Sequence, residues 1–186
     1  MTDDTLIVGA GIIGLLTARA LLKQGRKVRL LDAGADRPCA SWAAGGILSP
    51  LFPWRYDAAV TRLTRDAVAR YRQLADELVA EGCADPQVDA CGLLVLEPDA
   101  QAALAWCRAQ GVTASAVVAG DVQAGMGEQS ALWLPQLGAV RNSRLLHSLR
   151  QSLARQGVTP ESMPVLRLQK MADGWRLAPT QVNFAG

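Results

Sequence analysis

The sequence predicts an α/β fold, in which a Rossmann-like parallel sheet with flanking helices is interrupted by an antiparallel piece. Three observations support it. An apolar run over residues 5–8 leads into a glycine-rich turn, a helical pattern and a second strand. Strands and helices alternate at both ends of the chain, and its middle is richer in short strands. The length of 186 residues suits one domain, or one domain with a small appendage.

The opening turn has the pattern Gly9-x-Gly11-x-x-Gly14, between the strand over residues 5–8 and a helix over 12–24. Gly9 permits a tight turn, Gly11 lets the backbone lie close to a pyrophosphate, and Gly14 lets the helix pack closely on the sheet. The helix N-terminus offers unpaired N–H groups and the positive end of its dipole to phosphates. The pattern predicts a dinucleotide site; the alternative is a glycine turn that binds nothing.

The second strand is predicted from Val28, Leu30 and Leu31, after Gly25 has ended the helix. Asp32 closes this strand, where an acid can accept hydrogen bonds from ribose hydroxyls. A negative charge at this position disfavours a 2′-phosphate, so NADP is not expected. The alternative is that Asp32 only caps a turn at the end of the strand.

The middle of the chain begins with residues 34–54, which are too rich in glycine for a regular element. Such an apolar loop must be held against its own domain or a ligand. Residues 57–81 predict one long amphipathic helix, whose charged face is most simply a solvated surface. The other elements expected here are a turn region over 82–91, a strand over 92–96, a helix over 99–110, and strands at 117–118 and 132–134.

The last part of the chain predicts a helix over residues 144–156, capped by Asn142 or Ser143 and ended by Gly157. The single histidine, His147, lies within it and is expected to be a surface or packing residue. The apolar face of this helix comprises Leu145, Leu146, Leu149 and Leu153. Further strands are expected at 164–168, 174–177 and 182–185.

The composition excludes several classes of function. The net charge of +2, with no long charged run, argues against nucleic acid and membrane partners. The four cysteines form no C-x-x-C pair, so we expect no metal site and reduced free thiols. The apolar run over residues 6–22 is preceded by Asp3 and Asp4 and interrupted by Arg19, unlike a secretion signal. A cytoplasmic, soluble protein is therefore expected.

A second motif, residues 41–56, reads Ser-Trp-Ala-Ala-Gly-Gly-Ile-Leu-Ser-Pro-Leu-Phe-Pro-Trp-Arg-Tyr. Together with the opening turn it resembles the D-amino-acid-oxidase-type flavoenzymes, and among them the glycine oxidases linked to thiamine biosynthesis. The resemblance implies FAD as cofactor and oxidation of a small amino acid, glycine first, to an imine and 2-oxo acid, ammonia and hydrogen peroxide. The alternatives are a D-amino-acid dehydrogenase that reduces a quinone, and a non-catalytic nucleotide-binding module.

The resemblance also implies which residues hold the cofactor, and it assigns no catalytic residue. The turn, the end of the second strand and a following loop would hold the ADP part, a later segment would pass the flavin ring, and one backbone position would meet the adenine. In that order these residues are Gly9, Gly11, Ile12, Ile13, Gly14, Asp32, Ala33, Ala40 and Ser41; Gly45, Gly46 and Ile47; and Val165.

The same resemblance predicts a domain division and a missing part. Residues 1–82 and 136–186 would form a discontinuous, incomplete FAD-binding domain, and residues 83–135 part of a substrate domain. Family members continue for a comparable length and there supply the arginine that pairs with the substrate carboxylate. We therefore expect the chain alone to be inactive, and to associate with a C-terminal half or with copies of itself.

Overall fold

The computed structural model describes residues 5–34, 39–96, 99–163, 166–171 and 174–179, and the chain divides into two compact units. Unit 1 comprises Met1–Ala44 and Leu146–Gly186, and unit 2 comprises Gly45–Leu145. The predicted division into an FAD-binding and a substrate domain concerns function, and it remains a prediction. The compact units group residues 45–82 and 136–145 with the middle of the chain.

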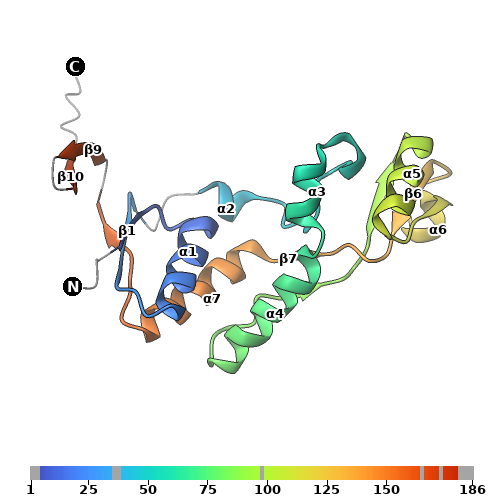
Figure 1. The fold of residues 1–186 in the computed structure, drawn as a ribbon. Helices are drawn as coiled ribbons and strands as arrows, with labels where there is room; N and C mark the ends of the chain where they lie inside the picture. The colour runs from blue at the N-terminus through green and yellow to red at the C-terminus, as the bar shows by residue number, and fades with distance from the viewer. Residues whose placement is uncertain (1–4, 35–38, 97–98, 164–165, 172–173, 180–186) are drawn as a thin grey trace, which may run out of the picture. The chain divides into compact units, whose positions relative to one another are not determined.

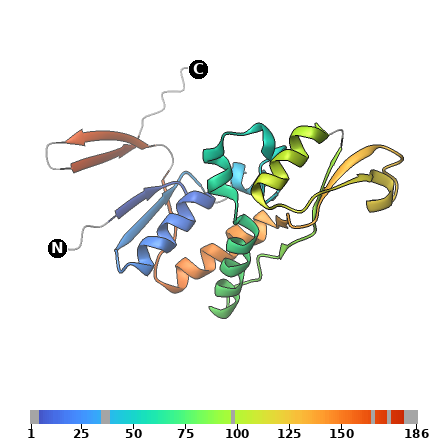
Figure 2. The same ribbon diagram turned by 45° about the vertical axis from the view of Figure 1, so that its right-hand side comes forward.

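Unit 1 is built on a three-stranded parallel sheet in the order β1-β2-β8. Helix α1 connects the first two strands, and α1 lies beside the end of α7 (Figures 1 and 2). The buried Arg19 guanidinium donates a hydrogen bond of 2.5 Å from Nη1 to Ser152 Oγ, which joins these helices. The elements are β1 Thr5–Val8, α1 Ile12–Lys23, β2 Val28–Asp32, β8 Glu161–Ser162 and, from Leu146 onward, α7 Asn142–Arg155. The predicted strand–helix–strand opening is confirmed.

The C-terminus of α1 follows the predicted glycine stop. Gly25 has φ 73°, its N–H donates to the Leu22 carbonyl at 2.9 Å, and the Arg26 N–H donates to the Leu21 carbonyl at 3.1 Å. This pair of bonds satisfies carbonyl groups that the helix itself leaves unpaired. Gly157, with φ 78°, ends α7 in the same way.

The start of α7 differs from the prediction. The helix begins at Asn142, and the Leu145 N–H donates to the Arg141 carbonyl at 2.9 Å. Asn142 and Ser143 therefore lie in the first turn, not before it. The four leucines expected on one face are buried, as predicted, because they recur at helical spacing. His147 is exposed, which confirms it as a surface residue.

A separate antiparallel hairpin follows β8 and consists of β9 Leu166–Met171 and β10 Gly174–Pro179. The strands predicted at 164–168 and 174–177 are confirmed over the described residues, and both run further than expected. The strand predicted at 182–185 lies outside the described residues.

The main sheet of unit 2 is antiparallel, with strand order β4-β6-β5, and α5 packs against it (Figure 1). Asp99 caps α5, because its carboxylate accepts a hydrogen bond of 3.2 Å from the Ala102 N–H. The elements are β4 Leu93–Leu96, α5 Ala100–Gln110, β5 Ser115–Val118, α6 Ala119–Val122 and β6 Ser130–Leu134. Their shared core contains Val95, Ala103, Cys107, Leu132 and Leu134. The predicted strands and helix are confirmed here; α6 was not expected.

A second antiparallel pair joins β3 Val88–Asp89 to β7 Ala139–Val140.

Two predictions for residues 34–81 are wrong. The long helix is two helices, α3 Ala58–Thr64 and α4 Ala67–Ala80. The Thr64 hydroxyl donates to the Val60 carbonyl at 2.9 Å, and Asp66, with φ −104°, forms the N-cap of α4. Such side-chain bonds compete with the helical pattern and favour a break. The preceding loop also contains two short helical turns, α2 Ala40–Ala43 and η1 Pro53–Arg55.

An ion pair links the sheet strands β2 and β8 and gives unit 1 a small pH dependence. Arg29 donates to both carboxylate oxygens of Glu161, at 3.0 and 2.8 Å. This hydrogen bonding lowers the pKa of Glu161 from its ordinary value of 4.5. A lowered folded pKa adds stability above that ordinary value, and the contribution is lost as the pH falls through the folded pKa.

We therefore expect wild type to melt slightly above Glu161→Gln at about pH 6, and the difference to be smaller at about pH 3. Thermal unfolding followed by circular dichroism checks this. The effect should be small because the pair is exposed, and added salt should reduce it further. An equal difference at both pH values would show that the ion pair is not its source.

Candidate functional site

The glycine turn between β1 and α1 has the geometry that its sequence predicts. Gly9 has φ 105°, a backbone conformation that side chains disfavour. A Cβ atom on Gly14 would lie 1.8 Å from the Gly9 carbonyl oxygen and 3.5 Å from Ile7 Cγ2. The predicted close packing of helix on strand at Gly14 is therefore confirmed. A Cβ atom on Gly11 would lie 3.1 Å from Ser41 Oγ, which is a tight contact with a movable atom.

The N-terminus of α1 has backbone N–H groups that are available to bind an anion. The Ile12 N–H donates to Ser41 Oγ at 3.0 Å, and helical bonding begins with the Leu15 N–H, which donates to the Gly11 carbonyl at 3.0 Å. Between them, the N–H groups of Ile13 and Gly14 have no partner among the described residues. The first turn of α1 also contains no acidic residue. Two free donors at the positive end of a helix can bind a phosphate.

Asp32 lies beside this turn, at the end of β2. Its Oδ2 accepts a hydrogen bond of 2.5 Å from the Ala10 N–H, and its Oδ1 accepts one of 3.0 Å from the Gly34 N–H. A carboxylate has about four acceptor positions, so about two remain for another donor such as a hydroxyl group. The exposed Ala33 continues the chain away from the strand.

The loop that carries Ala40 and Ser41 is brought to the turn through one side chain. Helix α2 carries the half-buried Ser41, whose hydroxyl oxygen accepts the hydrogen bond from the Ile12 N–H. Its neighbour Ala40 is exposed. In unit 1 the structure therefore brings the turn, Asp32 and Ser41 together at the N-terminus of α1. Val165 lies outside the described residues.

The segment predicted to pass the flavin ring lies in unit 2 and pairs with β7. The Val140 N–H donates to the Gly46 carbonyl at 2.9 Å, and Ile47 forms an antiparallel bridge with Ala139. Gly46 has φ 73°, and a Cβ atom there would lie 2.1 Å from the Val140 carbonyl oxygen. The pairing with β7 thus requires glycine at position 46, which sequence reasoning attributed to a bound ring. A Cβ atom on Gly45 would meet no atom within 4 Å, so its surroundings are open.

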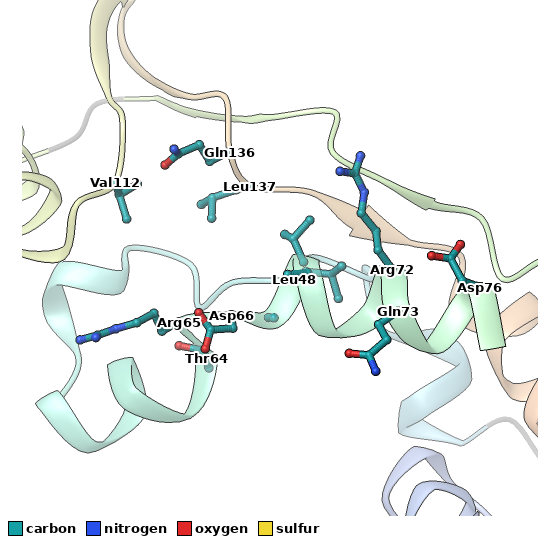
Figure 3. Close-up of a pocket in the computed structure, with 13 residues that line it drawn as sticks. Leu48, Thr64, Arg65, Asp66, Arg72, Gln73, Asp76, Val112, Gln136 and Leu137 are labelled. Atoms are coloured by element: carbon teal, nitrogen blue, oxygen red, sulfur yellow. The ribbon is translucent and has the colours of Figure 1, made fainter. Parts of the chain in front are cut away.

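A cavity of about 590 Å³ lies in unit 2 (Figure 3). Leu48, Val112 and Leu137 supply apolar side chains to it. Its polar side chains come largely from the end of α3, the two residues that follow it and the first ten residues of α4. They are Thr64, Arg65, Asp66, Arg72, Gln73, Asp76 and Gln136. Both signs of charge are present, so this lining does not favour an ion of either sign.

No metal centre is evident in the part of the chain that the structure describes, where no three His, Cys, Asp or Glu residues cluster suitably. The four cysteines are free, and burial raises the pKa of the Cys107 thiol. Among the helices described, none is both long enough and apolar enough to cross a membrane.

Comparisons with known proteins place the chain in a family. A family model described as FAD dependent oxidoreductase (DAO) matches residues 4–185. The chain is 42% identical over 159 residues to a glycine oxidase of Pseudomonas aeruginosa, and 40% identical over 162 residues to one of Pseudomonas putida. Each match covers 82% of this chain and 44% of the relative. The chain thus spans less than half the length of these curated relatives.

A solved structure of glycine oxidase from Bacillus cereus superposes with a TM-score of 0.76 at 21% identity. The superposition covers 96% of this chain and 53% of that one, and at this identity it supports the fold. The family match spans nearly the whole chain, including the glycine turn and Asp32. The chain therefore belongs to the DAO family of FAD-dependent oxidoreductases.

Proposed function

We propose that this protein binds FAD and takes part in oxidising the C–N bond of a small amino acid, with glycine as the first candidate. With dioxygen as the final electron acceptor, the products would be hydrogen peroxide and an imine, which water hydrolyses to a 2-oxo acid and ammonia. The observation that carries the proposal is the N-terminus of α1, where two N–H groups are free and the preceding turn is bound by the Asp32 carboxylate. The glycine oxidases at 40–42% identity support the substrate class.

The residues of unit 1 fit the ADP part of FAD. The N–H groups of Ile13 and Gly14 would bind the diphosphate. Gly11, without a side chain, would let it approach the backbone of the turn. The Ser41 hydroxyl accepts from Ile12 and keeps its own proton to donate to a phosphate oxygen. The open acceptor positions of Asp32 would receive the ribose hydroxyls, and we keep Val165 as the predicted adenine contact.

In unit 2, Gly45, Gly46 and Ile47 remain our candidates for the flavin ring. Gly45 is exposed and its surroundings are open, as close approach of a planar group requires. FAD, when bound, supplies the two-electron oxidation, and the protein supplies binding and orientation. None of the described residues is proposed as an acid or a base.

The test is a peroxide assay with glycine, sarcosine and D-alanine, in the presence of excess FAD. It should be run on the 186-residue chain and on the longest natural product of its gene. We expect peroxide from glycine in the longest product, without an added electron acceptor. Turnover that requires a quinone would support the dehydrogenase alternative. A folded, colourless protein that binds no flavin would support the non-catalytic alternative.

Three further expectations belong to this proposal. They are a cytoplasmic location, association with itself or with a C-terminal half, and a link to thiamine biosynthesis. Each follows from the sequence and the family resemblance, and each stays a prediction.

A further inference from the structure

We propose that Asp32 is a positioning residue that fixes the glycine turn in its phosphate-binding conformation, in addition to meeting the ribose. The proposal deepens the proposed function and rests on it for the identity of the ligand. Its evidence is a pair of hydrogen bonds that Asp32 makes within the chain, without a ligand.

The first bond ties the turn to β2. Asp32 Oδ2 accepts from the Ala10 N–H at 2.5 Å, and Ala10 is only 1% exposed. The preceding residue is tied by the strand itself, because the Gly9 N–H donates to the Leu31 carbonyl at 2.7 Å. Two consecutive N–H groups of the turn are therefore held by β2, one through the main chain and one through the carboxylate. Without Asp32, a buried N–H group would lack its acceptor, which is unfavourable.

Asp32 is itself anchored at two further points, one on its carboxylate and one on its main chain. Asp32 Oδ1 accepts from the Gly34 N–H at 3.0 Å, and the Asp32 carbonyl accepts from the Met163 N–H at 2.7 Å, just after β8. Asp32 thus joins the turn, the loop after β2 and the chain after β8. Its short side chain reaches the Ala10 N–H directly.

The position of Ala10 matters because the free donors follow it closely. Ile13 and Gly14 lie in the first turn of α1, and a Cβ atom on Gly14 would meet the Gly9 carbonyl oxygen. If Ala10 were released, the whole turn would be less well fixed, and the two free N–H groups would be less well aimed. Asp32 should therefore raise the affinity for a diphosphate even when the ligand has no ribose hydroxyls.

Calorimetric titration of wild type and Asp32→Asn with ADP and with 2′,3′-dideoxy-ADP separates the two roles. The asparagine keeps the shape of the side chain but has one acceptor oxygen in place of two. If Asp32 positions the turn, Asp32→Asn should weaken the binding of dideoxy-ADP by about tenfold, as expected for one charge-assisted hydrogen bond. It should weaken ADP by at least as much, because ADP also loses its ribose contact. A ribose-only role would weaken ADP alone. The affinity for dideoxy-ADP would then stay unchanged, or rise because a negative charge is removed, and the proposal would be wrong.

Amide hydrogen exchange gives a second measurement that needs neither ligand nor variant. The Ala10 N–H of the flavin-free wild-type chain should be protected, and in Asp32→Ala, which leaves no side-chain acceptor at this position, it should exchange faster. Unprotected exchange in wild type would overturn the proposal even if the variant failed to fold. Asp76→Asn is the matched control, because this exposed carboxylate has no partner among the described residues and should leave both measurements unchanged. If wild type binds neither nucleotide, the proposed function fails, while the exchange of Ala10 still decides whether Asp32 holds the turn.

Discussion

Gly14→Ala should unfold much of the flavin-free unit 1, or destabilise it by about 3 kcal/mol or more. The new Cβ atom would lie 1.8 Å from the Gly9 carbonyl oxygen, and the neighbouring atom is backbone that cannot rotate away. The helix would have to move off the strand, which would also displace the N–H groups at its start. Urea denaturation of the flavin-free chain, followed by circular dichroism, measures the loss.

Two variants serve as controls for Gly14→Ala. Gly11→Ala would place its Cβ atom 3.1 Å from a serine hydroxyl, and it should cost much less than Gly14→Ala because a side chain can shift. Gly45→Ala would meet no atom within 4 Å, and its folded stability should change little. Equal losses at Gly14 and Gly11 would mean that close packing of helix on strand does not explain the third glycine of the turn.

Gly46→Ala should also destabilise the flavin-free chain by about 3 kcal/mol or more, because two unfavourable effects add. A side chain at φ 73° is strained by itself, and this Cβ atom would lie 2.1 Å from the Val140 carbonyl oxygen. The clash would disrupt the pairing of residues 46–48 with β7. The same denaturation measurement checks it.

Gly25→Ala is the matched control for Gly46→Ala. Gly25 has the same φ of 73°, but a Cβ atom there would meet nothing within 4 Å. It should therefore cost only the left-handed strain, about 1–2 kcal/mol. If the two variants lose the same stability without flavin, the contact with β7 is not what requires glycine at position 46.

The opening of the fold could be predicted because its determinants are local. An apolar strand, a glycine turn, a helix with a glycine stop and a second strand each have their own sequence pattern, and all four are found as expected. The break between α3 and α4 could not be predicted in this way. The apolar spacing continues across it, and the competing bond from Thr64 to Val60 becomes visible only in the structure.

The candidate site was predictable in part. The three glycines and Asp32 follow from the motif, because each has a distinct steric or hydrogen-bonding role. The bonds from Ala10 to Asp32 and from Ile12 to Ser41 join residues 22 and 29 positions apart, and no local pattern encodes them. Gly46 shows a further limit. In sequence alone, a glycine required by a bound ring looks the same as a glycine required by a neighbouring strand.

The measurement that tests the central claim most directly is a titration of the 186-residue chain with FAD, followed by the amide NMR signals of α1. If the N-terminus of α1 and Asp32 hold the ADP part of the cofactor, FAD should shift the signals of Ile13 and Gly14 most strongly, and ADP should reproduce those shifts. A chain that is folded, yet whose Ile13 and Gly14 signals stay unmoved at saturating FAD, would contradict the assignment of this site.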